Sequence, residues 1–91
     1  MKNRFATMPE ADEAPSEQSV TDYDHAHLKL YARLLDAERE NASLIEIAEI
    51  LLGIDAVSEP ERARRVHASH LERARWMTEH GYRDMLARGL P

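Results

Sequence analysis

The segment "NASLIEIAEILLGID", near the middle of the chain, constrains the fold more than any other stretch. Its apolar residues recur at helical spacing, which predicts a short helix from about Leu44 to Leu52. Ser43 and Glu46 have the capping-box spacing, in which each side chain satisfies a free amide of the first turn. Gly53 follows directly, and glycine readily takes the left-handed conformation that ends a helix.

The same segment indicates how the next helix is placed. Ala48 is small and lies among apolar residues, so it permits a close approach between two helices, and Gly53 lets the chain reverse sharply. Both features are typical of the helix-turn-helix motif, in which two helices cross at a steep angle. The alternative is a small helical bundle without that motif.

The remaining pattern is also helical and predicts an all-α fold. We expect a small helix-turn-helix-like bundle of about four helices with a disordered N-terminal tail. Its first helix should run from about Tyr23 to Asn41, with Thr21 or Asp22 as the capping residue.

A long helix should follow the turn. Ser58 and Glu61 repeat the capping-box spacing, and Pro60 suits the first turn of a helix, where its missing N–H is not needed. The helix should reach His80, with Gly81 as its stop. The block "YRDMLAR" then predicts a last short helix.

Length and N-terminal composition predict the domain organisation. The chain of 91 residues suffices for one domain. Residues 1–21 contain two prolines and mainly small or acidic side chains, so we expect a flexible acidic tail there and a helix-turn-helix-like domain over residues 22–91. The longest apolar stretch, "IAEILLGI", is far below the roughly 18 residues of a membrane helix, which favours a cytoplasmic location.

The charge balance argues against a strong nucleic-acid binder. The formal net charge is −5 at pH 7, whereas nucleic-acid-binding domains are typically basic. Residues 58–91 are net positive, with seven arginines against five acids. That bias is small, so we expect DNA binding to be weak or absent.

The long helix carries two distinct faces. At about 100° per residue, its core stripe should consist of Ala63, Val66, His67, His70, Ala74 and Met77. We name the opposite side the Arg/Trp face: Arg62, Arg65, Ser69, Arg73 and Trp76. Tryptophan and arginine are enriched at protein-interface hot spots, so this face is our candidate partner-binding site. The alternatives are direct DNA reading and internal packing with the arginines paired to nearby acids.

The sequence indicates no catalytic, metal or cofactor site. It has no cysteine, no Gly-rich phosphate loop and no nucleophile elbow. His67 and His70 share a face, but without a carboxylate at ligand spacing they are more simply core residues. We therefore expect no enzyme activity, no cofactor, no metal and no small-molecule ligand.

Two stretches carry a resemblance to a known family. "LIEIAEILLG" and "HGYRDMLARG" resemble segments of the domain-of-unknown-function family 2285, and the resemblance extends over residues 28–88. It implies a helix-turn-helix variant that acts in the control of integrative and conjugative elements. Some members of that family activate excision genes, and a small stand-alone member is a quorum-sensing antiactivator.

The resemblance and the acidic balance together give a functional hypothesis. The chain would be a transcriptional antiactivator that binds and blocks a LuxR-type quorum-sensing activator, an excision activator of the same domain family, or both. It would thereby repress horizontal transfer of the element. The alternative is a DNA-binding helix-turn-helix transcription or excision regulator, with the long helix in the major groove.

Overall fold

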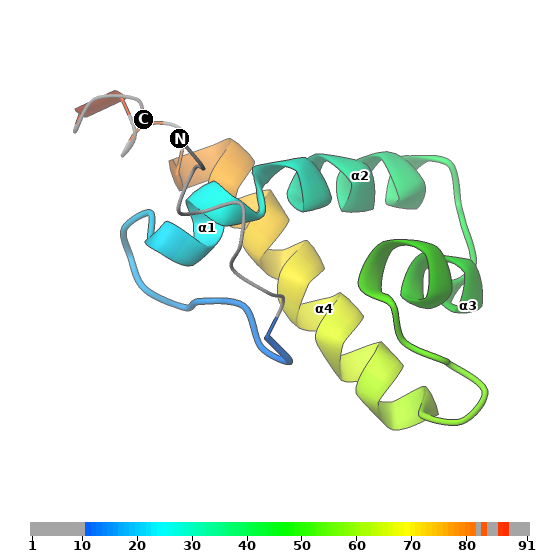
Figure 1. Cartoon of the computed structure of the whole chain (residues 1–91). Helices are drawn as coiled ribbons and strands as arrows, with labels where there is room; N and C mark the ends of the chain where they lie inside the picture. Colours follow the sequence, from blue (N-terminus) through cyan, green and yellow to red (C-terminus); the bar gives the residue numbers. More distant parts are fainter. Residues whose placement is uncertain (1–10, 82, 84–85, 88–91) are drawn as a thin grey trace, which may run out of the picture.

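The computed structural model of the chain describes residues 11–81, 83, 86 and 87 (Figure 1). Its elements, in chain order, are α1 (Asp22–Ala26), α2 (Leu28–Arg39), α3 (Leu44–Ile47), the π-helical turn η2 (Ala48–Leu52), α4 (Pro60–Trp76) and the π-helical turn η3 (Met77–Gly81). These described residues include no strand, and the prediction of an all-α, helix-turn-helix-like bundle is confirmed. Within the same ranges, no helix has the length and apolar character needed to cross a membrane.

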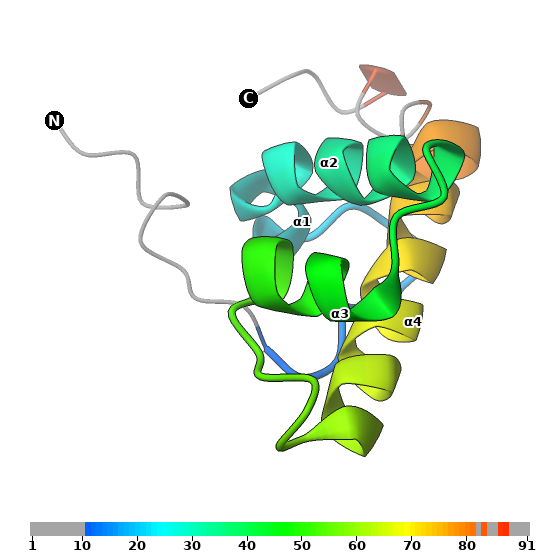
Figure 2. The ribbon, with the colours of Figure 1, turned by 90° about the vertical axis from the view of Figure 1, so that its right-hand side faces the viewer.

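The core lies where α2, α3 and α4 meet. α4 runs across α2, and α3 lies beside both of them near the N-terminal half of α4 (Figures 1 and 2). Leu34, Ile47 and Leu71, one from each helix, form a buried cluster between them. Two further clusters extend the core toward the ends of α4: Tyr31, Ala74 and Met77 at one end, and Ala48, Ile54, Ala56, Ala63 and Val66 at the other.

The core stripe predicted for the long helix is largely confirmed. His67 is only partly buried, and the other five members are buried: Ala63, Val66, His70, Ala74 and Met77. The buried side of α4 also includes Leu71 and Arg73, which the sequence pattern did not assign to it.

The short helix begins and ends where predicted, but its capping box is only half formed. The Ser43 hydroxyl accepts a hydrogen bond from the Glu46 amide at 3.2 Å, whereas the Glu46 carboxylate accepts from the Ser43 hydroxyl and not from the Ser43 amide. The helix continues through η2 and ends at Gly53, which has a φ of +67°. The Ile54 amide then donates to the Ala48 carbonyl at 2.9 Å, and the Ile54 side chain enters the core.

The connection to α4 differs from the prediction. Asp55 accepts hydrogen bonds from the amide and the hydroxyl of Ser58, at 3.3 and 2.8 Å. Because Asp55 holds that hydroxyl, Ser58 does not cap α4, and the N-cap residue is Glu59. The predicted capping box of Ser58 and Glu61 is therefore wrong, whereas Pro60 does begin the helix.

The first predicted helix is divided in two. Thr21, one of the two expected capping residues, caps α1, and it does so through a reciprocal capping box with Asp24 that was not predicted. The helix then breaks at His27, because its Nδ1 lies 2.8 Å from the Tyr23 carbonyl oxygen and takes the place of a backbone donor. The predicted continuous helix from Tyr23 to Asn41 is therefore wrong. Asn41, with a φ of +58°, follows the end of α2.

The end of the long helix also differs from the prediction. Gly81 is the last residue of η3 and does not have the positive φ expected of a helix stop. A Cβ atom at Gly81 would lie 2.6 Å from Sδ of Met77 and 2.9 Å from Cζ3 of Trp76, so this glycine permits close packing. The predicted helix over "YRDMLAR" falls mostly outside the described residues.

A buried ion pair joins α1 to α4. Asp24 is fully buried, and Arg73 donates to its carboxylate from Nε at 3.0 Å and from Nη2 at 2.7 Å. The Tyr31 hydroxyl and the Thr21 amide also donate to it, at 2.7 and 2.9 Å. Burial alone would raise the pKa of Asp24, but these hydrogen bonds outweigh it and hold the pKa below its usual 3.8.

The segment before α1 is packed against α4. We name residues 11–19 the strap, which runs beside α4 before it enters α1 (Figure 1). Arg73 donates from Nη1 to the Glu17 carbonyl at 2.7 Å and from Nη2 to the Ser19 carbonyl at 3.0 Å. We expected residues 1–21 to form a flexible tail, yet their described part, from residue 11 onward, belongs to the packed domain. For these described residues the structure differs from the expectation, because their backbone carbonyls satisfy a buried guanidinium, which composition does not reveal.

Replacing Asp24 by Asn should destabilise the domain by about 3–5 kcal/mol, because it leaves the Arg73 charge buried without its counter-ion. The lowered pKa also sets the pH dependence. The stabilisation is complete above the unfolded pKa near 3.8 and is lost as pH falls through the lower folded value. Urea unfolding followed by circular dichroism at neutral and acidic pH measures both effects.

The control for this experiment is Asp36→Asn, which removes an exposed carboxylate that pairs with Arg39 on α2. Exposed ion pairs contribute about 0–1 kcal/mol, so this variant should stay close to the wild type. Equal stability of the two variants would contradict the central role of the buried pair.

Candidate functional site

The strap covers much of the Arg/Trp face. The Ser69 hydroxyl accepts a hydrogen bond from the Ala14 amide of the strap at 2.8 Å. Arg73 is 4% exposed, and its Cζ lies 3.9 Å from the centroid of the Trp76 ring. Three of the five residues of this face are therefore engaged inside the chain, which fits the interpretation of internal packing.

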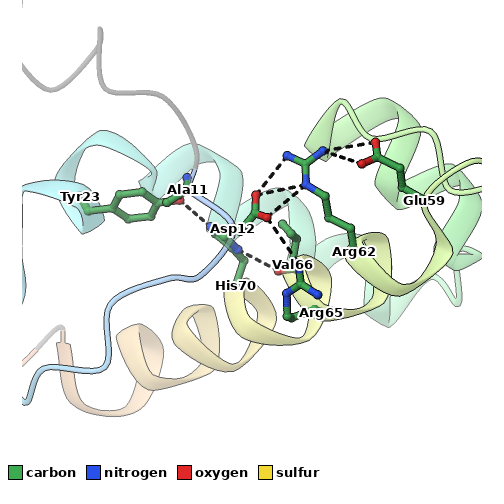
Figure 3. Close-up of polar contacts among 8 residues, drawn as sticks. All are labelled: Ala11, Asp12, Tyr23, Glu59, Arg62, Arg65, Val66 and His70. Atoms are coloured by element: carbon green, nitrogen blue, oxygen red, sulfur yellow. Dashed lines mark hydrogen bonds and ion pairs between the residues drawn. The ribbon is translucent and has the colours of Figure 1, made fainter.

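Arg62 and Arg65, the other two residues of that face, meet the strap at Asp12 (Figure 3). Nε of Arg62 lies 3.2 Å from both carboxylate oxygens, Nη2 of Arg62 lies 3.1 Å from Oδ1, and Nη2 of Arg65 lies 3.5 Å from Oδ2. The hydrogen bonds from Arg62, supported by Arg65, hold the pKa of Asp12 below its usual 3.8. The three side chains are 40–52% exposed, so solvent and solutes can reach the contact.

A chain of hydrogen bonds fixes the start of the strap (Figure 3). Nδ1 of His70 lies 2.8 Å from the Val66 carbonyl oxygen, so Nδ1 donates and Nε2 is left as an acceptor. The Tyr23 hydroxyl lies 2.5 Å from Nε2 and accepts the Ala11 amide at 2.9 Å. His70 is thus a buried core residue, as predicted, and its ring links α4 to α1 and the strap.

The exposed side of α4 shares only Arg65 with the Arg/Trp face. We name it the outer face, and its exposed residues are Glu61, Arg64, Arg65, Ala68, Glu72 and Arg75. Arg64 pairs with Glu61 at 3.2 Å, and Arg75 pairs with Glu38 of α2. The whole of α4 holds five arginines against two glutamates, whereas the rest of the chain holds seven basic residues against fifteen acids. Positive charge is therefore concentrated on this helix.

Sequence reasoning missed Arg64, Ala68 and Arg75 as members of the exposed side. Helical spacing does not reveal them, because at about 100° per residue the buried Leu71 lies on the side of Arg64 and Arg75 and nearly opposite Trp76. The burial of Arg73 carried no local signal either. It depends on Asp24, a partner 49 positions earlier in the chain.

The chemistry available on α4 is that of guanidinium groups held on a rigid helix. Guanidinium groups match phosphate oxygens and guanine edges, which accept two hydrogen bonds in one plane. No group of three or more His, Asp or Glu side chains among residues 11–81, 83, 86 and 87 is arranged to hold a metal ion.

Replacing Arg62 by Ala should raise the pKa of Asp12 toward its usual value, because the main donors to its carboxylate are removed. An NMR titration of the Asp12 carboxyl carbon measures this change. Arg64→Ala is the matched control, since Arg64 pairs with Glu61 instead. An Asp12 pKa that moved equally in both variants would contradict the specific contact.

Comparison with known proteins identifies a family. Residues 2–87 match the RovC DNA-binding-domain model, which is described as "T6SS, Transcription factor, DNA binding domain". No curated protein matches the chain.

This match corrects three expectations. The assignment to the domain-of-unknown-function family 2285 is wrong, since a segment such as "LIEIAEILLG" occurs in many helix-turn-helix proteins. The expectation of weak or absent DNA binding is also wrong, because the whole-chain charge hides the arginines of α4 among acids that lie elsewhere. The predicted partners, a LuxR-type regulator and an excision activator, lose their basis with that resemblance. Because the match covers nearly the whole chain, the chain belongs to the RovC family of transcription-factor DNA-binding domains.

Proposed function

We propose that this chain is a non-enzymatic transcription regulator that binds duplex DNA through the outer face of α4 and the adjoining Arg62. The observation that carries the proposal is the set of three arginines in the first two turns of α4: Arg62, Arg64 and Arg65. In helix-turn-helix proteins, the N-terminal part of the second helix contacts base edges in the major groove. α4 corresponds to that second helix, because it follows α3 and the connecting turn.

The outer face also has a shape that suits a groove. An α-helix with side chains is about 10–12 Å wide, which matches the roughly 12 Å width of the major groove. Ala68 lies one turn beyond Arg64 and Arg65, and its methyl group keeps the middle of the face low. The arginines of the preceding turn can then extend to bases or phosphates.

The charge distribution orients the domain on DNA. Arginines outnumber glutamates on α4, and the rest of the chain is strongly acidic. Acidic surfaces are repelled by the phosphate backbone, whereas the arginines of α4 attract it. The acidic balance therefore disfavours approach by the other faces and does not prevent approach by α4.

The arginines of the outer face are free to change partners. Arg64 and its partner Glu61 have side chains that are 62% and 81% exposed. Such exposed pairs contribute little free energy, so DNA can replace them at small cost. Arg64 and Arg65 suit guanine edges or phosphates, and Glu61 suits the amino group of cytosine.

A double Arg64→Glu, Arg65→Glu variant should lose DNA affinity by at least about tenfold, because each good bidentate pair with a base contributes about 1–3 kcal/mol. The slope of log K against log salt should also become shallower, by roughly 0.9 for each phosphate that the variant no longer neutralises. Fluorescence anisotropy of a labelled duplex of about three helical turns, titrated at several salt concentrations, gives both quantities.

The matched control is Lys29→Glu, Arg33→Glu, which makes the same charge change on exposed positions of α2. It should reduce affinity only slightly, through long-range charge. An equal loss in the two double variants, with folding intact by circular dichroism, would contradict binding by the outer face.

The family description also names T6SS, and we extend it to the targets of this chain. The purified chain should retain host genomic fragments that contain promoters of T6SS genes. Sequencing of the retained fragments checks this expectation. Enrichment of unrelated promoters alone would contradict the choice of targets and leave DNA binding in place.

A further inference from the structure

Arg62 and Arg65 form an oxyanion-binding site that is already occupied in the free chain. The Asp12 carboxylate receives hydrogen bonds from Nε and Nη2 of Arg62 and from Nη2 of Arg65 (Figure 3). A phosphodiester presents two charged oxygens in a similar arrangement, and guanidinium groups bind carboxylates and phosphates with the same donor geometry. The Asp12 carboxylate therefore occupies donors that would suit a phosphate oxygen equally well.

We propose that Asp12 competes with a backbone phosphate for Arg62 and Arg65, so that the strap acts as an intramolecular brake on DNA binding. This inference rests on the proposed function, because the competitor is the DNA that α4 binds. DNA binding displaces Asp12 from the two arginines. The displaced carboxylate then returns to solvent.

The strap is held weakly at its front and firmly at its back, as a displaceable brake requires. The Asp12 contacts are exposed at the surface, and exposed ion pairs break easily. At the other end of the strap, Arg73 is buried and holds the Glu17 and Ser19 carbonyls. The hydrogen bond from the Ala11 amide to the Tyr23 hydroxyl is also at the surface, so the front of the strap can leave α4 once this bond and the Asp12 contacts break, while its back remains anchored.

The hydrogen bond at Ser69 lies between the front and the back of the strap. The Ala14 amide donates to the Ser69 hydroxyl at 2.8 Å, one turn of α4 beyond Arg65. This hydrogen bond directs Asp12 toward Arg62 and Arg65 in the free chain. It also limits how far the front of the strap must move when a phosphate takes its place.

Asp12→Asn in the full chain tests the proposal. Removing the carboxylate charge should tighten binding to the labelled duplex by roughly two- to tenfold at low salt, as expected when two exposed ion pairs no longer have to be broken. The gain should shrink or vanish in an Arg62→Ala background, because the site that Asp12 occupies is then incomplete.

The matched control is Glu13→Gln, which removes the same charge from the next residue of the strap. A larger gain for Asp12→Asn than for Glu13→Gln supports the proposal. Equal gains, or a gain that persists undiminished in Arg62→Ala, would overturn it by showing a general charge effect.

Failure of the brake and failure of the proposed DNA binding would give different results. If the Arg64→Glu, Arg65→Glu variant loses affinity while Asp12→Asn behaves as its control, the brake is wrong and DNA binding by α4 stands. If neither the wild type nor Asp12→Asn binds the duplex, the proposed function fails and the brake fails with it.

Discussion

The buried ion pair between Asp24 and Arg73 determines the arrangement of the rest of the structure. Two charges removed from water are stable only when their hydrogen-bonding capacity is met, and here Tyr31, Thr21 and two strap carbonyls complete it. The pair joins α1, α2 and the strap to one side of α4. It therefore decides which side of α4 is covered and which side stays open.

The same ion pair determines which side of α4 remains exposed to solvent. Arg73 is drawn into the core, Trp76 lies beside its guanidinium, and Ser69 is taken by the strap. Among the arginines of α4 that remain at least partly exposed, Arg62, Arg64 and Arg65 lie near its start, where a helix-turn-helix protein meets DNA, and Arg75 lies near its end. The same anchoring holds Asp12 over two of them. A single buried ion pair thus shapes both the DNA-facing surface that we propose and its competitor.

Local signals in the sequence predicted the local structure. The Ser43 cap, the Gly53 stop and the apolar spacing of the core depend on neighbours a few residues away, so they could be identified. The site could not, because Arg73 and Asp12 find their partners about 50 positions away. Two local predictions failed where a nearby side chain intervened: Asp55 takes the Ser58 hydroxyl, and His27 takes the Tyr23 carbonyl. Net charge misled the functional hypothesis, because it averages over surfaces that face different ways.

The most direct measurement is an NMR titration of the isotope-labelled chain with a DNA duplex, following each backbone amide. If α4 reads DNA, the largest shifts should cluster at Arg62, Arg64, Arg65 and Ala68, together with Asp12 and Ala14 at the front of the strap. The amides of α2 around Lys29 and Arg33 should change little. The largest shifts on α2, with α4 unaffected, would contradict the assignment of the outer face as the DNA-binding surface.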